Sequence, residues 1–403
     1  MKRLDSRLHG NDRKRHFRTF YERIKLEYQT FFLSTDLKIR TLGVTACSNP
    51  GAVLIFQPGL PAADLKEFYK KGKGMTDKEW NAGRLVSVSG AYWEAFALHA
   101  GVSLDVFTML GDEPMETAAL AQKVNADERG LETLLNALTA MGLLCKADGR
   151  FMNTEASSTF LKTTSPSSMS GMIRHHRHLV SSWARLPEAV RRGLPVRKKR
   201  RTRDEIRSFL LGMMNQAGRI APRVAGEIDL YSRRHLLDLG GGPGTFAVQF
   251  CMANPRMKAT VFDLPAARPF ASQVIEESGL SGRVRFLAGD YLKNDVGGPY
   301  DVVWLSHVLH SMGPEECLFV IRKAVSALER DGLILVHDFF LSDTHDAPLF
   351  PALFALNMLV NTLQGRSYSE KEVKDMLSGA GVKEVIRLPF TGPTDSGILC
   401  GRV

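Results

Sequence analysis

The sequence lacks any uninterrupted apolar run of the roughly 18 residues that a membrane-spanning helix requires, so we expect no membrane partner. Cysteine is scarce as well. The five cysteines lie far apart, with no CxxC pair and no Cys/His cluster at the spacing of metal ligands. This pattern argues against a structural zinc site and favours free thiols in a reducing compartment. We therefore expect a cytoplasmic protein that binds no metal.

Positive charge is the one compositional excess, with a formal net charge of +10 over 403 residues. Residues 1–40 hold eleven Lys and Arg against five Asp and Glu, and residues 197–203 add six more positive charges. Away from these two segments the chain is close to neutral. Because the second cluster follows Pro195, we expect a solvated surface loop there and no nucleic-acid partner.

The length of the chain predicts two folded domains. Residues 1–74 are basic at the start and interrupted by Pro and Gly, which predicts a poorly ordered extension and a native start near Met75. We expect a helical, winged-helix domain over residues 75–205. An α/β domain is expected over residues 206–403.

The first of these domains has the helical period of apolar residues from Trp80 onward. Residues 115–121 and 127–144 then read as two helices, and residues 145–153 as a hairpin that turns at Asp148-Gly149, the order of a winged helix. A DNA-binding winged helix needs basic residues on its second helix, where Arg129 is the only one. We therefore expect packing and dimerisation, with a cofactor-sensing DNA-binding regulator as an alternative.

Strands alternate with helices from residue 235 to the C-terminus, which predicts a Rossmann-like α/β fold with a parallel sheet. In such sheets, ligands bind at the carboxyl ends of the strands. The predicted strands are residues 235–239, 259–262, 284–288, 302–306 and 333–337.

The first strand ends in the sequence LDLGGGPGTF, whose glycines allow close approach of the backbone to a ligand. Residues 242–247 also fit the GxGxxA spacing of a dinucleotide fingerprint, so a NAD-dependent oxidoreductase is an alternative. Asp238 stands where that cofactor would need space for its pyrophosphate, and it suits a cationic amino-acid group instead. Asp263 ends the second strand at the distance expected for ribose hydroxyls. Asp290 ends the third, where a carboxylate can accept from an adenine amino group beside the Tyr291 ring.

The motifs LDLGGGPG, VFDLP, GDY and LSHVLH resemble the caffeate- and acetylserotonin-type O-methyltransferase family, from about Trp80 to the C-terminus. The resemblance implies a class I methyltransferase domain that binds S-adenosyl-L-methionine without a metal. It also implies a homodimer formed through an N-terminal winged-helix domain. The predicted cofactor-binding residues are Asp238, Gly240, Gly242, Asp263, Leu264, Asp290, Tyr291 and Ser306.

Methyl transfer to a phenol needs a base, and histidine is the side chain best suited to that role at neutral pH. The resemblance places the family's general base at His310 and the acid that orients its imidazole at Asp338. His307 reads as a packing or capping residue. The chain departs from the family at Ser311-Met312, usually Asp-Trp, and at Ser367, where plant members have Glu. These departures leave a C- or N-methyltransferase as an alternative.

The acceptor is expected to be a small aromatic or polyketide-like molecule with a hydroxyl group. Met213 and Met358 match family residues that hold a flat aromatic ring. The helix over residues 349–363 is almost wholly apolar, which suits either a greasy acceptor or a subunit interface. The predicted acceptor-binding residues are Phe209, Met213, Asn357, Met358 and Asn361.

Overall fold

A computed structural model describes residues 80–197 and 201–403 of the chain. The predictions for residues 1–74 lie outside the described residues. The N-terminal half is mainly helical, and its elements are α3 Ala82–Gly90, α4 Tyr92–Ser103, α5 Val106–Leu110, β1 Met115–Glu116, α6 Thr117–Val124, α7 Glu128–Ala140, β2 Leu144–Ala147, β3 Arg150–Asn153, α8 Glu155–Phe160, α9 Ser170–Trp183 and α10 Leu186–Arg192.

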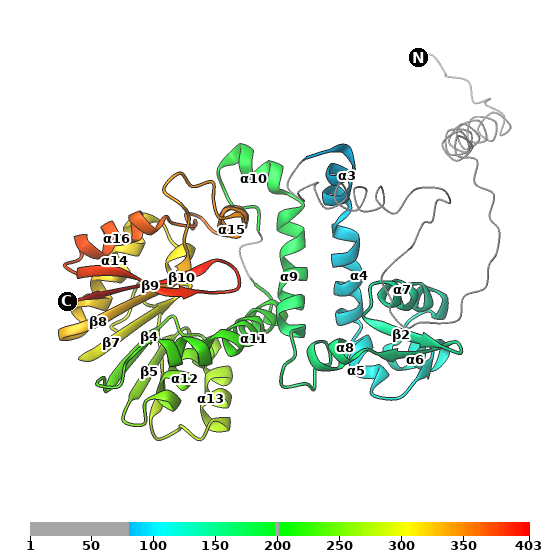
Figure 1. The fold of residues 1–403 in the computed structure, drawn as a ribbon, viewed down its shortest axis with the longest axis horizontal. Helices are drawn as coiled ribbons and strands as arrows, with labels where there is room; N and C mark the ends of the chain where they lie inside the picture. Colours follow the sequence, from blue (N-terminus) through cyan, green and yellow to red (C-terminus); the bar gives the residue numbers. More distant parts are fainter. Residues whose placement is uncertain (1–79, 198–200) are drawn as a thin grey trace, which may run out of the picture. The chain divides into compact units, whose positions relative to one another are not determined.

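Helices α6 and α7 with the hairpin β2–β3 form the predicted winged helix (Figure 1). The hairpin turns at Asp148 and Gly149, whose φ angles of 49° and 74° give the left-handed pair that a two-residue turn requires. Leu131, Leu135 and Leu138 recur along one face of α7 and are all buried. This stripe fixes α7 on the core of the module.

One detail of this module differs from the sequence prediction. Residues 115–121 were expected to be entirely helical, but Met115 and Glu116 form strand β1, and helix α6 begins at Thr117. The reason is pairing: Met115 lies opposite Phe151 and Glu116 opposite Arg150, so β1 adds a third strand to the wing. A contact with a strand distant in sequence has overridden the local helical pattern.

The C-terminal half begins with the long helix α11 Arg203–Glu227, which is capped by Thr202 and Glu205 in a reciprocal capping box. Helix α11 packs on α9 on one side and on α12 on the other. The predicted domain boundary at residues 205 and 206 therefore falls inside this helix. The predicted surface loop over residues 197–203 ends earlier than expected, since Arg203 is already helical.

The remaining elements alternate between strands and helices, as predicted. They are β4 His235–Leu239, α12 Thr245–Ala253, β5 Lys258–Asp263, η1 Pro265–Ala267, α13 Arg268–Glu277, β6 Val284–Ala288, β7 Tyr300–Ser306, η2 Leu309–Ser311, α14 Pro314–Ser326, β8 Leu328–Phe339, α15 Leu349–Asn361, α16 Glu370–Gly379, β9 Lys383–Thr391 and β10 Ser396–Arg402.

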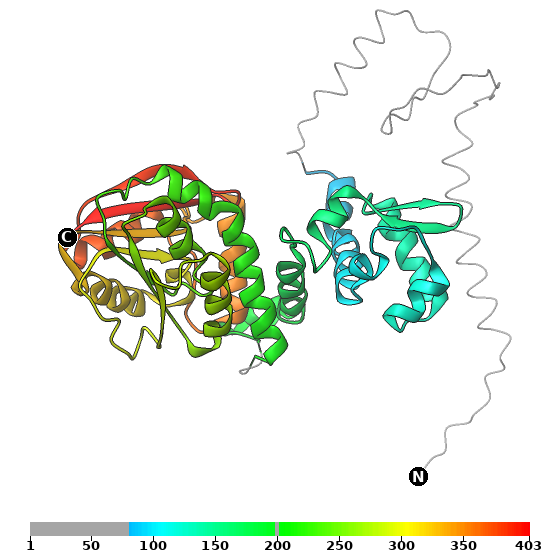
Figure 2. The same cartoon turned by 90° about the horizontal axis from the view of Figure 1, so that it is seen from below.

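These strands form one sheet in the order β6-β5-β4-β7-β8-β10-β9 (Figures 1 and 2). The five strands from β4 to β8 are parallel, as the sequence predicted, while β9 and β10 are antiparallel and were not predicted. Helices α11, α12 and α13 contribute to the core on one face of the sheet, and α14 and α16 to the core on the other. Trp304 of β7 is fully buried in the first of these cores, against Phe246 and Phe250 of α12. In the described part of the chain, no helix has both the length and the apolar character to cross a membrane.

Candidate active site

The strand order places a ligand site at the carboxyl end of β4. Strands β4 and β7 are neighbours, and the chain leaves β4 toward β5 but leaves β7 toward β8, in the opposite direction. A crevice opens at such a switch point in open α/β sheets. The glycine turn 240–244 and the segment 306–310 both begin there.

The glycine turn brings the backbone closer to its neighbours than any side chain allows. Gly240 has a φ of 75° and donates its N–H to the Phe262 carbonyl at 2.8 Å. A Cβ on Gly240 would lie 2.6 Å from Val308 Cγ2, and one on Gly244, also at φ 75°, 2.9 Å from Val261 Cγ2. Only glycine fits both the left-handed backbone and the space at these two positions.

Asp238 is a buried carboxyl beneath this turn, with 1% of its surface exposed. Its Oδ2 accepts a hydrogen bond from Ala247 N at 3.3 Å, while Oδ1 is buried without a hydrogen-bond partner among the described residues. Burial raises the pKa of Asp238 to about 7, and the nearby Asp263 carboxylate adds to the shift. An unpaired buried acceptor of this kind suits a ligand that supplies an ammonium donor.

Asp263 and Asp290 follow the next two strands. Asp263 accepts from Gly242 N at 2.7 Å and from Leu264 N at 2.6 Å, which fixes its carboxylate beside the turn, and burial raises its pKa. Asp290 pairs with Lys293 at 2.9 Å, and hydrogen bonding to that ammonium lowers its pKa. The structure therefore brings the predicted acids together at the carboxyl ends of the parallel strands.

Tyr291 borders the same turn, since its Cε1 lies 3.7 Å from the position of a Cβ on Gly240. Ser306 is engaged elsewhere: its Oγ forms a hydrogen bond with Nδ1 of His337 at 2.9 Å, and His337 Nε2 lies 3.1 Å from Ser396 Oγ. His337 is fully buried, and burial holds its pKa well below the ordinary value. A neutral histidine thus ties Ser306 to β10, which sequence reasoning could not foresee without that strand.

His310 and Asp338 meet at the carboxyl ends of β7 and β8. His310 Nδ1 lies 2.7 Å from Asp338 Oδ1, which also accepts from Phe339 N at 2.9 Å. Burial alone would raise the pKa of Asp338. The pairing with His310, whose Nδ1 is hydrogen-bonded to the carboxylate, and the nearby His307 imidazole outweigh burial and hold that pKa well below the ordinary value. An ionised Asp338 can only accept, so the His310 proton sits on Nδ1 and Nε2 is left as the free base.

His307 shares this carboxylate, which the sequence did not indicate. Its Nδ1 lies 3.4 Å from Asp338 Oδ1, and its backbone has a φ of 57°. Positive φ is uncommon outside glycine and is what turns the chain from β7 toward His310. The three side chains lie close enough to one another to hold a metal ion. A His-x-x-His spacing at a strand end was the one sequence signal for this pairing.

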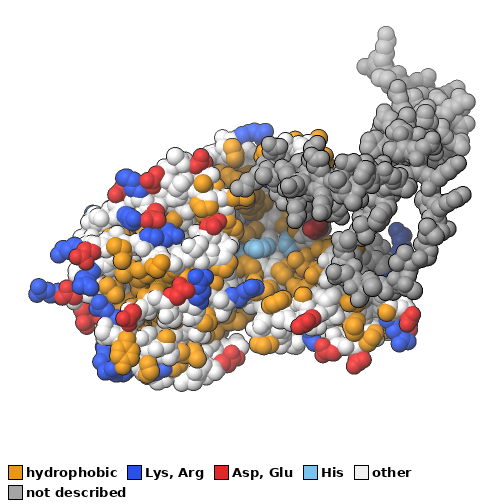
Figure 3. Space-filling view, viewed as in Figure 1, with side chains coloured by type: hydrophobic (Ala, Val, Ile, Leu, Met, Phe, Trp, Pro, Cys, Tyr) orange, Lys and Arg blue, Asp and Glu red, His pale blue; other side chains and the backbone are white. Residues whose placement is uncertain are grey.

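An aromatic cluster stands beside these histidines. The Phe339 ring lies 4.4 Å from that of His307, and the Phe354 ring is edge-on to His310 at 4.8 Å, with Phe350 packed against both phenylalanines. Figure 3 shows histidine side chains in a hollow bordered by hydrophobic side chains. None of these phenylalanines was predicted as a site residue. Phe350 and Phe354 belong to the apolar helix α15, which was expected to contact either the acceptor or a second subunit, and Phe339 ends β8.

The predicted acceptor residues occupy α11 and α15. Met358 is buried and Met213 is partly buried. Phe209 lies against His175 at 5.3 Å between ring centroids, with the Arg201 guanidinium 4.7 Å from its ring. The two asparagines are engaged with the protein. Asn357 Oδ1 accepts from Trp183 Nε1 at 3.0 Å and from Asn361 Nδ2 at 2.9 Å.

The residues that depart from the family pattern have structural partners of their own. Ser311 Oγ donates to the Val308 carbonyl at 2.7 Å, within the turn that carries His310. Ser367 is buried and donates to the Pro351 carbonyl at 2.8 Å, so it anchors the start of α15. Both serines therefore stabilise backbone segments beside the site.

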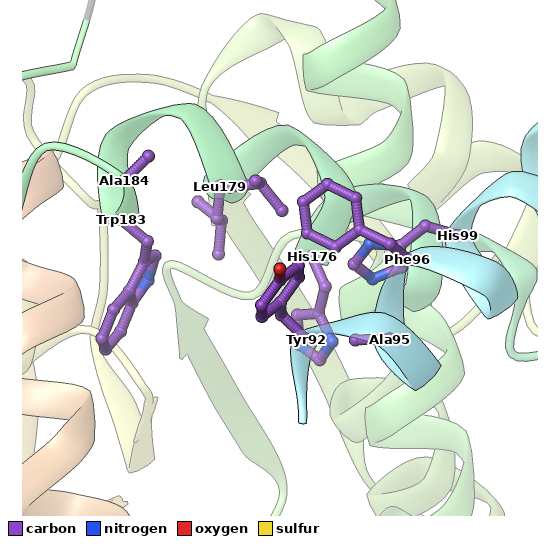
Figure 4. Close-up of a pocket in the computed structure, with 9 residues that line it drawn as sticks. Tyr92, Ala95, Phe96, His99, His176, Leu179, Trp183 and Ala184 are labelled. Atoms are coloured by element: carbon purple, nitrogen blue, oxygen red, sulfur yellow. The ribbon is translucent and has the colours of Figure 1, made fainter. Parts of the chain in front are cut away.

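A separate groove of about 480 Å³ lies between α4 and α9 (Figure 4). Its walls are mainly apolar, with His99 and His176 among them. Burial lowers the pKa of both histidines, so they add little charge to the groove at neutral pH. The other labelled walls are Tyr92, Ala95, Phe96, Leu179, Trp183 and Ala184.

The fold and the glycine turn with its acids define an S-adenosylmethionine-dependent methyltransferase. The chain belongs to the O-methyltransferase family: residues 188–383 match the model of the O-methyltransferase domain, and residues 86–163 match that of the O-methyltransferase dimerisation domain. The predicted class, cofactor and family are thereby confirmed, and the nicotinamide and regulator alternatives are set aside.

Two of the similar curated proteins are O-methyltransferases from Streptomyces. The tetracenomycin polyketide synthesis 8-O-methyl transferase of Streptomyces glaucescens is 30% identical over 77% of this chain and 94% of that protein. The 3-hydroxy-5-methyl-1-naphthoate 3-O-methyltransferase of Streptomyces sahachiroi is 29% identical over 79% of this chain and 94% of that protein. The structure of human N-acetylserotonin methyltransferase in complex with SAM is 27% identical, with a TM-score of 0.71 over 81% of this chain and 99% of that one.

Proposed function

We propose that the enzyme methylates a hydroxyl group of a small, flat aromatic or polyketide-like molecule. The ring cluster of Phe339, Phe350 and Phe354 beside His310 supports an aromatic acceptor, because aromatic rings pack well against one another edge-on or offset. The naphthoate and tetracenomycin relatives act on molecules of that kind by name.

S-adenosylmethionine fits the glycine turn, and this chain's residues would hold it at defined points. The orphan Oδ1 of Asp238 would take its ammonium group, Asp263 the ribose hydroxyls, and Asp290 with Tyr291 the adenine, while Gly240 and Gly242 leave room for the backbone to approach. When bound, the cofactor supplies a methyl group on a sulfonium, which is already activated for displacement. The protein therefore has to align the acceptor and remove its proton.

His310 is the proposed general base, and the single observation that supports it best is its 2.7 Å hydrogen bond to Asp338. The bond fixes the ring and puts the proton on Nδ1, so that Nε2 can take the hydroxyl proton of the acceptor. Asp338 stabilises the imidazolium that forms. Proton removal turns a weakly nucleophilic phenol into a phenolate.

The test is release of S-adenosylhomocysteine with a panel of phenols, naphthols and aromatic amines. His310→Asn should lower kcat by about 10²–10⁴-fold with cofactor affinity retained, because the variant loses the base alone. His235→Asn is the matched control, since His235 is exposed at the amino end of β4, while His310 lies at the carboxyl ends of the strands. Full turnover of His310→Asn, or methylation of amines alone, would contradict the proposal.

The proposal includes a homodimer formed through the N-terminal half, over the predicted domain of residues 75–205. The dimerisation model matches there, and α3 and α4 expose large apolar side chains that a second copy would bury. Trp93→Asp should shift the protein from dimer to monomer in analytical ultracentrifugation, and a wild-type monomer would contradict it. These side chains are Leu85, Val86, Val88, Tyr92, Trp93 and Phe96.

A cytoplasmic location also belongs to the proposal. Cys145, Cys251, Cys317 and Cys400 are all free thiols in the structure, which supports a reducing compartment. Fractionation of cells that express the chain should recover it with the cytoplasmic proteins. Recovery from a membrane or secreted fraction would contradict the location.

A further inference from the structure

His307 is a side chain of the candidate site to which the proposed base chemistry assigns no role. It follows β7 directly, its N–H donates to the His337 carbonyl at 2.8 Å, and its φ of 57° starts the turn into η2. This turn carries His310 back toward the same carboxylate. The two imidazoles therefore converge on Asp338 from positions three residues apart, with ring centroids separated by 5.9 Å.

Both rings direct the same nitrogen at the carboxylate. Nδ1 of His310 lies 2.7 Å and Nδ1 of His307 3.4 Å from Oδ1 of Asp338. Only the His310 contact is a hydrogen bond, and Nδ1 of His307 is buried without a hydrogen-bond partner among the described residues. Since Asp338 is held ionised, it accepts from Nδ1–H of His310, and its negative charge 3.4 Å away favours a proton on Nδ1 of His307 as well. Nε2 lies on the opposite side of each imidazole and is a hydrogen-bond acceptor in that tautomer. No group in the described parts of the chain donates to either Nε2.

The aromatic side chains around the two imidazoles suit a flat ring that lies across Nε2 of His307 and Nε2 of His310. Phe339 packs on the His307 ring at 4.4 Å and Phe354 on the His310 ring at 4.8 Å, so aromatic walls border both imidazoles. Neighbouring hydroxyls on an aromatic system are separated by about 2.7 Å, close to a hydrogen-bond length. The ring centroids of the two imidazoles are 5.9 Å apart, so one hydroxyl of such a pair can lie beside each ring and donate to its Nε2.

We propose that His307 is a specificity-determining residue whose Nε2 accepts a hydrogen bond from a second hydroxyl, adjacent to the one that is methylated. The enzyme then prefers acceptors with two neighbouring hydroxyls over otherwise identical acceptors with one. The inference rests on the proposed function of His310, which takes the proton of the first hydroxyl. Loss of the second hydroxyl leaves a desolvated Nε2 without a partner, which weakens acceptor binding.

The test compares 2,3-dihydroxynaphthalene with 2-naphthol as acceptors, with saturating S-adenosylmethionine and with EDTA present so that no metal ion bridges the diol. Two equivalent hydroxyls give a twofold statistical advantage in kcat/KM without any recognition. Wild-type enzyme should show about a tenfold or greater preference for the diol. In His307→Gly, where glycine tolerates the left-handed backbone, the ratio of the two kcat/KM values should return to about two.

His307→Asn is the conservative variant, because asparagine also tolerates positive φ and keeps an acceptor, and it should restore part of the preference. An unchanged ratio of the kcat/KM values in His307→Gly would overturn the inference. An equal loss of kcat/KM with both acceptors would also overturn it, because His307 would then act only through Asp338. If the wild type methylates neither probe, fluorescence titration of both into the complex with S-adenosylhomocysteine gives the same comparison. Equal wild-type affinities would overturn it. Failure of the proposal that His310 is the general base would give a different result, namely 2-naphthol methylation that persists in His310→Asn.

Discussion

Replacement of Asp238 by Asn tests the electrostatic design of the cofactor site without any acceptor. Burial raises the pKa of this carboxyl from 3.8 to about 7 in the cofactor-free protein. Its proton is therefore bound more tightly in the folded state than in the unfolded one. The stability that this proton contributes is fully present below pH 3.8 and is lost as the pH rises through about 7.

The magnitude follows from the shift. Between pH 5 and pH 8 the unfolded chain keeps the carboxyl ionised, while the folded protein must give up its proton over about two pH units. At about 1.4 kcal/mol per unit, the free energy of unfolding falls by about 3 kcal/mol over this range from Asp238 alone. That is a large fraction of the 5–15 kcal/mol that typically holds a domain folded.

The assay is urea unfolding at pH 5 and pH 8 without cofactor. The free energy of unfolding of Asp238→Asn relative to wild type should rise by about 3 kcal/mol from the lower pH to the higher, because the variant has no buried charge to ionise. The variant should also lose affinity for S-adenosylhomocysteine. Asp343→Asn, which changes an exposed carboxyl before α15, should give a difference independent of pH. A pH-independent difference for Asp238→Asn as well would refute the reasoning.

Three further predictions concern the same site at the carboxyl ends of the strands. Asp338→Asn should lower kcat about 100-fold or more with cofactor affinity unchanged, measured by S-adenosylhomocysteine release and calorimetry, because the His310 proton is no longer held on Nδ1; unaltered kcat would contradict this. Gly240→Ala should destabilise the protein by about 2 kcal/mol or more and abolish cofactor binding. Gly279→Ala, at φ 68° but in open space, should cost only about 1 kcal/mol in urea unfolding; equal losses would show that the Val308 clash is unimportant. EDTA should leave turnover unchanged, while added Zn²⁺ should inhibit by occupying His307, His310 and Asp338; a loss of activity in EDTA would show that a resident metal takes part.

The parallel strands could be predicted because each contains a short apolar run, which ends at Gly or Asp in every strand except β7, where Ser306 and His307 end it. Strands β9 and β10 could not: Pro389 lies inside β9, and Gly397 and Gly401 lie inside β10. Proline and glycine argue locally against a strand, and proline is tolerated in β9 because that strand forms the edge of the sheet. Pairing with the buried strand β8 decides the outcome for β10.

The acids of the candidate site were predictable for the same reason, since Asp238, Asp263 and Asp290 each stand at the end of a strand. The sharing of Asp338 by two histidines was not. It depends on the left-handed backbone at His307, which no residue pattern specifies. The phenylalanine cluster was not predicted because Phe339 ends β8 while Phe350 and Phe354 lie on α15, and only the packing of α15 against the end of β8 brings them together.

The most direct test of the central claim is the rate of a single methyl transfer as a function of pH, measured by rapid quench with cofactor bound and 2-naphthol as acceptor. If His310 removes the proton, the wild-type rate should reach its plateau near neutral pH. His310→Asn should be slower by about 10²–10⁴-fold at pH 7, and its rate should rise about tenfold per unit toward pH 10, where a phenol ionises by itself. Identical pH profiles for the two proteins would contradict the account.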